Sequence, residues 1–142
     1  MVCAFFGHRD APTAIFPAIS RMIEMLILEK GIDVFYVGHQ GKFDKMVYRE
    51  LCRAKVKYPH VDCVVVLAYP PKKGEKWELE TLYPFGLERA PRAYAILARN
   101  AWMVERADFV VSYVTRQFGG AAKAVSLAKR KGCEIFSLPC EM

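Results

Sequence analysis

The chain has 142 residues, a formal charge of +6 and a hydrophobic fraction of 54%. This length suits one domain over residues 1–142, and the hydrophobic fraction indicates a sheet covered on both faces, a subunit interface, or both. The longest apolar run, Val64 to Tyr69, is much shorter than the roughly 20 residues of a membrane-spanning helix. The first residues also lack the basic stretch of a secretory signal. We therefore expect a cytoplasmic protein with no membrane partner.

The cysteines and histidines show no pattern typical of a metal centre. The five cysteines, an odd number, have no C-x-x-C spacing, which favours reduced thiols with structural roles over a redox or metal-binding role. They are Cys3, Cys52, Cys63, Cys133 and Cys140. The three histidines, His8, His39 and His60, are also scattered without metal-ligand spacing. We therefore expect no bound metal.

Short apolar runs alternate with segments of helical periodicity along the chain, which predicts strands alternating with helices. In chain order, we expect a strand at Val2–Phe6, a helix closed by Gly31, a strand at Asp33–Val37, a helix from Phe43 to about Tyr58, a strand at Val61–Ala68, a helix carrying Ala93 to Val104, a strand at Phe109–Val114, a helix at Ala121–Lys131 and a strand at Glu134–Leu138. Such an alternation forms a parallel sheet with right-handed crossovers. The predicted fold is a three-layer, Rossmann-like α/β domain with a five-stranded, mainly parallel sheet.

The segment from Tyr69 to Pro91 breaks this pattern with prolines, glycines and charged residues. It is too long for an ordinary connection, and such segments are often lids or binding loops. Its aromatic residues Trp77, Tyr83 and Phe85 lie near three lysines. They either stack the bases of a single-stranded nucleic acid or pack the segment onto the domain or a second subunit.

Ligands of parallel α/β sheets bind beyond the carboxyl ends of the strands. Four segments follow expected strands in this way: Gly7–Arg9, Gly38–Gly41, Tyr69–Pro71 and Thr115–Gly120. Three of them contain glycine and two contain histidine. We therefore expect the ligand site to be built from these segments.

Gly119 and Gly120 lie between the fourth expected strand and the helix that starts near Ala121. Glycines let the backbone turn sharply and approach a ligand closely, and the free N–H groups at a helix N-terminus favour an anion. The pair makes either a plain turn or a phosphate-binding loop. Its place at the end of a strand favours the phosphate-binding loop.

The segment Gly7-His8-Arg9 follows the first strand. Arg9 can pair with both oxygens of a phosphate or carboxylate, and His8 can donate to an oxygen or exchange a proton near neutral pH. The alternative is an exposed loop with a salt bridge to Asp10.

Two further segments carry candidate ligand residues. Asp44 follows Gly38 and Gly41 in the first turn of a helix, where it either interacts with the helix dipole and caps the helix or accepts a hydrogen bond from a ribose or base. Asn100 falls on the apolar stripe of the next helix, and a buried amide needs hydrogen-bond partners. It either ties down a loop or orients a ligand group, and the neighbouring Arg99 belongs either to the same site or to a solvated basic face.

These motifs, in this order, resemble the SLOG superfamily and within it the YpsA-like branch. The matching segments are Cys3 to Arg9, Gly38 to Asp44, Arg99-Asn100-x-x-Met103 with Ala107-Asp108, and Gly119-Gly120. The resemblance spans nearly the whole chain. It implies a Rossmann-like fold, a nucleotide or NAD-related ligand held by the glycine pair, and a homo-oligomer, commonly a dimer.

The superfamily includes LOG-type phosphoribohydrolases, which release a base from a nucleoside monophosphate. Arg99 and Met103 match their R-K-x-x-M helix motif, with Asn100 in place of the lysine. The glycine pair matches their P-G-G-x-G-T motif, but Phe118 replaces the proline and no glutamate follows before the end of the helix. The resemblance therefore implies nucleotide binding without the carboxylate that would stabilise an oxocarbenium-like transition state.

Three functions follow from these patterns, and none requires a resident cofactor. The first is the binding or sensing of a nucleotide-derived ligand. The second is LOG-type hydrolysis, with Arg99 and a displaced carboxylate, Glu88 or Glu80, as candidate catalytic residues. The third is the binding of single-stranded nucleic acid, since the superfamily contains DNA-binding members. The expected ligand-binding residues are Gly7, His8, Arg9, Gly38, Gly41, Asp44, Arg99, Asn100, Phe118, Gly119 and Gly120.

Overall fold

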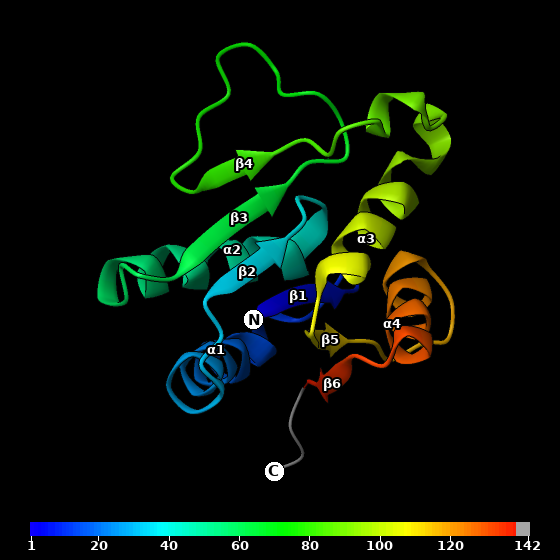
Figure 1. Ribbon diagram of the computed structural model, residues 1–142. Helices are drawn as coiled ribbons and strands as arrows, with labels where there is room; N and C mark the ends of the chain where they lie inside the picture. The colour runs from blue at the N-terminus through cyan, green and yellow to red at the C-terminus, as the bar shows by residue number, and fades with distance from the viewer. Residues whose placement is uncertain (139–142) are drawn as a thin grey trace.

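A computed structural model describes residues 1–138, so Cys140 lies outside the described part of the chain. Helices and strands alternate through it and form three layers (Figure 1). The strands are β1 (Val2–Gly7), β2 (Val34–Val37), β3 (Asp62–Val66), β4 (Glu80–Leu82), β5 (Phe109–Tyr113) and β6 (Glu134–Ser137). The helices are α1 (Phe16–Lys30), α2 (Gly41–Lys57), α3 (Ala95–Arg106) and α4 (Gly120–Lys131), with short 3-10 turns η1 (Thr13–Ile15), η2 (Leu87–Arg89) and η3 (Arg92–Tyr94).

The sheet has the strand order β4-β3-β2-β1-β5-β6, and every pair of neighbours is parallel. The chain builds the sheet outward from β1 to β4 and then crosses to the other side of β1 for β5 and β6. The strand order therefore reverses between β1 and β5. This confirms the α/β class and the parallel sheet expected from the sequence.

The prediction of five strands is wrong, because the segment from Tyr69 to Pro91 contains a sixth strand. The three residues of β4 pair in parallel with β3, with Val64 opposite Glu80 and Val66 opposite Leu82. A strand of three residues at the edge of the sheet shows no useful hydrophobic period. Its exposed or half-buried side chains and its flanking prolines and charges concealed it in the sequence.

The central strand β1 divides the core into two parts because its side chains alternate between the faces of the sheet. Cys3 and Phe5 pack with the apolar sides of α1 and α2, whereas Ala4 and Phe6 pack with those of α3 and α4. Both faces of the sheet are therefore covered (Figure 1), which accounts for the high hydrophobic fraction. Among residues 1–138, no helix has the length and apolar character needed to cross a membrane.

Candidate functional site

A cavity of about 200 Å³ lies where the strand order reverses, beyond the carboxyl ends of β1, β2 and β5. Nine of the eleven residues expected to bind a ligand line it: Gly7, His8, Arg9, Gly38, Asp44, Arg99, Asn100, Gly119 and Gly120. Four segments that are far apart in the sequence thus meet in one place. The structure also places Gln40, Ile96 and Arg116 in the cavity wall, and these were not expected. Gln40 and Arg116 lie in the segments that follow β2 and β5. Their place after a strand was therefore the sequence feature that could have identified them as cavity residues.

Arg99 is buried, with 2% of its surface exposed, and each nitrogen of its guanidinium donates one hydrogen bond to a protein group. It donates to the Val66 carbonyl at 2.8 Å, to Oδ1 of Asn100 at 2.9 Å and to Oε1 of Gln40. Burial lowers the pKa of Arg99, and the nearby Asp44 carboxylate opposes this effect. The side chain therefore links the ends of β2 and β3 to α3, and it does not belong to a solvated basic face.

Two glycines make room for the side chains of this network. A Cβ atom built on Gly38 would lie 2.7 Å from Nη1 of Arg99, so any larger residue would displace the guanidinium. A Cβ atom on Gly7 would overlap the ring of Phe43 in α2. These glycines serve close packing beneath the cavity.

Asp44 is a buried carboxyl in the cavity wall. Burial raises its pKa to about 6, although Arg99, the Gln40 N–H and Arg9 favour the charged form. Its Oδ2 accepts a hydrogen bond from the Gln40 N–H at 2.8 Å, just before the start of α2. Asp44 therefore fixes the backbone at the residue before α2, and it also presents a carboxyl to the cavity.

His8 connects β1 to the loop that precedes α4. Its Nε2 accepts hydrogen bonds from the N–H groups of Thr115 at 2.9 Å and Arg116 at 3.3 Å. Burial and the charge of Arg116 lower the pKa of His8, and Asp10 opposes them. The neutral ring of His8 accepts both hydrogen bonds through Nε2 and so holds the loop at Thr115 and Arg116 in place.

Arg9 and Arg116 bring positive charge to the rim of the cavity. Arg116 is paired with Asp10 through both carboxylate oxygens, at 3.1 and 3.3 Å, so the salt bridge expected for this loop forms with Arg116. Arg9 is exposed and makes no ion pair or side-chain hydrogen bond within residues 1–138. Gly41, at φ +87°, packs against the backbone of Arg9 and supports it from beneath, outside the cavity lining.

The N-terminus of α4 opens into the cavity at Gly119 and Gly120. Gly119 has φ +99°, a value that favours glycine, and no side chain caps the helix. The first N–H groups of the helix have no intrahelical acceptor. A Cβ built on Gly120 would lie 3.9 Å from Nδ2 of Asn100, and this amide nitrogen donates no hydrogen bond to any described residue. Free donors from two helices thus converge here.

Some expected residues lie elsewhere. Phe118 is exposed, and its ring lies 5.7 Å below the Arg116 guanidinium rather than in the cavity wall. Glu88 and Glu80 are also exposed and do not line the cavity. No group of three metal-ligating side chains occurs within residues 1–138.

Comparison with known proteins supports the fold. No protein-family profile and no curated protein sequence matches the chain. Among solved structures, the chain is similar to the X-ray structure of DNA processing protein A (DprA) from Streptococcus pneumoniae, with a TM-score of 0.71 and 16% identity. The similarity covers 99% of this chain and 50% of that chain, so the chain spans about half the length of that protein. The described chain therefore has the Rossmann-like α/β fold of DprA.

Proposed function

We propose that the protein binds a phosphate-bearing, nucleotide-derived ligand in the cavity where the strand order reverses. The observation that carries this proposal is the uncapped N-terminus of α4, which opens at Gly119 and Gly120 into a cavity also lined by Arg9 and Asn100. Helix N-terminal N–H groups favour a phosphate. Arg9, which pairs with no carboxylate among residues 1–138, adds a cation, and Asn100 adds an amide donor. Arg99, whose donors are engaged, acts as a positioning residue.

Thermal unfolding with AMP and ADP-ribose tests this proposal through the variant Gly120→Asp. A ligand present at about 100 times its Kd stabilises the folded protein by about 2.7 kcal/mol, so the wild-type Tm rises by several degrees. In Gly120→Asp, a carboxylate occupies the phosphate position and abolishes the rise. The same charge at the helix N-terminus leaves the unliganded fold stable.

Ser126→Asp is the matched control, because it adds the same charge at an exposed position on α4 outside this cavity. It retains the ligand-induced rise. If neither AMP nor ADP-ribose changes the wild-type Tm, the proposed binding function is wrong.

Cleavage of the ligand is separated from binding by incubating the protein with AMP and measuring free adenine by chromatography. We expect no adenine, because Glu80 and Glu88 do not line the cavity. If adenine is released, Asp44→Asn identifies the group involved, since Asp44 is the carboxyl residue in the cavity lining.

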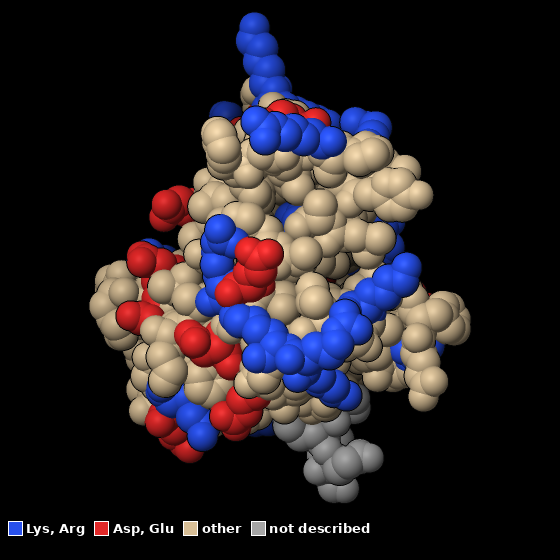
Figure 2. Space-filling model, turned by 45° about the vertical axis from the view of Figure 1, so that its right-hand side comes forward, with Lys and Arg blue, Asp and Glu red and all other residues tan. Residues whose placement is uncertain are grey.

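The similarity to DprA favours a second candidate function, the binding of nucleic acid. Figure 2 shows Lys and Arg side chains in a band across one face of the molecule, with carboxylates beside it. The exposed basic residues of α3 and α4 are Arg106, Lys123, Lys129, Arg130 and Lys131. Affinity for single-stranded DNA that falls steeply as salt increases would support this function, and failure to bind at low salt would exclude it.

Two of the three aromatic residues expected to stack bases are half-buried against the domain. Trp77 packs edge-on against His39 and Tyr48, and Tyr83 packs against the core. Phe85 alone of the three is exposed.

We also propose that the protein forms a homodimer. Sedimentation equilibrium measures its oligomeric state directly.

A further inference from the structure

The cavity where the strand order reverses, lined by Arg9, Asn100 and Gly120, is here called the phosphate cavity. A second cavity, of about 390 Å³, adjoins it and shares Gly38 and Asp44 with it. One wall is α2, which contributes Tyr48 and Cys52. The other is Trp77 in the segment that leads to β4, with His39 from the loop after β2. Of the residues that line this aromatic cavity, Tyr48 and Cys52 were not among the candidates from the sequence, whereas Gly38, Asp44 and Trp77 were.

The sizes of the two cavities show that a nucleotide needs more than the phosphate cavity alone. Ligand pockets commonly measure about 300–1,000 Å³, and the phosphate cavity has about 200 Å³. The aromatic cavity falls within the usual range. A groove of about 350 Å³ between α3 and α4 also adjoins the phosphate cavity, through Asn100 and Gly120, but no aromatic side chain lines it. The two neighbours of the phosphate cavity thus differ in chemistry.

The aromatic cavity suits a flat, weakly polar group because three aromatic rings line it, those of His39, Tyr48 and Trp77. The Trp77 ring meets His39 at a centroid distance of 4.5 Å and Tyr48 at 5.6 Å, both edge-on. Tyr48 is fixed because its hydroxyl accepts a hydrogen bond from the Glu78 N–H at 2.8 Å. The buried indole N–H of Trp77 has no acceptor among the described residues, although buried indole N–H groups usually find one.

We infer that the aromatic cavity binds the planar nitrogen heterocycle of the same ligand whose phosphate lies at Gly119 and Gly120. This inference rests on the proposed function. The ligand then spans the boundary between the two cavities at Gly38 and Asp44. Its sugar lies beside Asp44, whose carboxyl can accept a hydrogen bond from a hydroxyl. The heterocycle lies against the aromatic side chains of Trp77 and Tyr48. The ligand class is therefore a nucleoside phosphate rather than a sugar phosphate.

The fluorescence of Trp77 reports this binding directly. The chain has two tryptophans, and Trp102 lies beneath the Arg106 guanidinium, away from both cavities. In Trp102→Phe, Trp77 is the single tryptophan. We expect AMP and adenosine to change its emission, and ribose 5-phosphate to bind without changing it. Calorimetry should show AMP binding at least 10-fold more tightly than ribose 5-phosphate.

Two variants test the same cavity from opposite walls. Trp77→Leu removes the aromatic wall, and Cys52→Phe fills the cavity from α2. Each should reduce AMP affinity about 10-fold or more and leave ribose 5-phosphate affinity unchanged. The unchanged sugar phosphate affinity shows that both variants are folded, and Trp102→Phe serves as the control with wild-type affinity for both ligands.

The outcomes separate the two proposals. Equal affinities for AMP and ribose 5-phosphate, with constant Trp77 emission, overturn the heterocycle subsite and leave the phosphate site standing. A change of Trp77 emission with adenosine, without binding of ribose 5-phosphate, supports the aromatic subsite and overturns the phosphate anchor. If none of the three ligands binds, both proposals are wrong.

Discussion

Asp44 shows how burial gives a single residue a role that its sequence position does not reveal. Its carboxyl has lost most of its solvent, and this desolvation raises its pKa from an ordinary value of 3.8 to about 6. The folded protein therefore holds a proton on this group between these two pH values, whereas the unfolded chain releases it. Folding becomes less favourable as the pH rises through this range.

The variant Asp44→Asn tests this linkage. It removes the titrating group while keeping a side-chain oxygen for the Gln40 N–H. Between pH 4 and pH 7, the wild type should lose about 2 kcal/mol of unfolding free energy relative to the variant. Urea unfolding at one-unit pH intervals measures the difference. Parallel profiles for the two proteins would show that Asp44 titrates at its ordinary pKa.

Asp10→Asn provides a control of opposite sign. The hydrogen bonds from Arg116 hold the pKa of Asp10 below its ordinary value. The stabilising effect of this carboxylate is therefore present at neutral pH and is lost as the pH falls. Its variant should differ from the wild type at neutral pH and converge with it in acid.

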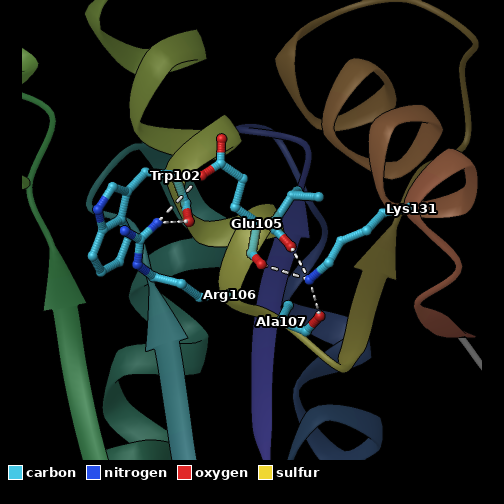
Figure 3. Close-up of polar contacts among 6 residues, drawn as sticks. Trp102, Glu105, Arg106, Ala107 and Lys131 are labelled. Carbon is cyan, nitrogen blue, oxygen red and sulfur yellow. Dashed lines mark hydrogen bonds and ion pairs between the residues drawn. The ribbon is translucent and has the colours of Figure 1, made fainter.

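At the level of elements, Lys131 holds the end of α3 against the end of α4. Its Nζ donates to the carbonyl oxygens of Val104 at 3.0 Å, Glu105 at 2.6 Å and Ala107 at 2.7 Å. Figure 3 shows this ammonium group directed at the carbonyls where α3 ends. The Ala107 N–H already donates to the Val104 carbonyl at 3.1 Å, and the ammonium group adds a charged donor at this helix end, where a cation also interacts favourably with the helix dipole. Of the basic cluster Lys129, Arg130 and Lys131 at the end of α4, Lys131 thus has a structural role.

Lys131→Met should lower the unfolding free energy by about 1–2 kcal/mol, because it leaves these carbonyls without their charged donor. Urea unfolding at neutral pH measures this loss. Lys129→Met is the matched control: Lys129 is exposed in the same basic cluster and makes no side-chain hydrogen bond within residues 1–138. Equal stabilities for the two variants would show that the three contacts contribute nothing beyond their charge.

At the level of the whole molecule, the strand order assembles the site. Because β1 lies next to both β2 and β5, the loops that follow these three strands meet at one edge of the sheet. The cavity wall therefore contains residues that are far apart in the sequence, such as His8 and Arg116, which are 108 positions apart. Ligand binding is expected to couple these loops.

Hydrogen exchange with AMP present should show this coupling. We expect slower exchange at residues 7–9, 38–41 and 115–122, and unchanged exchange in β6 on the outer side of the sheet. Protection should extend to residues 77 and 78 with AMP and be absent there with ribose 5-phosphate. Uniform protection of the whole chain would instead indicate a general stabilisation without a local site.

The sequence by itself determined the class of fold and the edge of the sheet at which the cavity lies. Alternating strand and helix patterns require a parallel sheet, and in such sheets the loops after the strands share one edge. Nine of the eleven expected ligand residues line the cavity for this reason. These features depend on local periodicity and on glycines, which are visible in a linear chain.

The tertiary structure alone decided which of these residues are free to meet a ligand. Arg99 and Arg9 look equivalent in the sequence. The guanidinium of Arg99 donates hydrogen bonds to Val66, Gln40 and Asn100, whereas Arg9 is unpaired among the described residues. The short edge strand β4 and the aromatic cavity beside Trp77 also depend on partners far along the chain. Burial and hydrogen-bond satisfaction are properties of three-dimensional neighbours, so local patterns could not predict them.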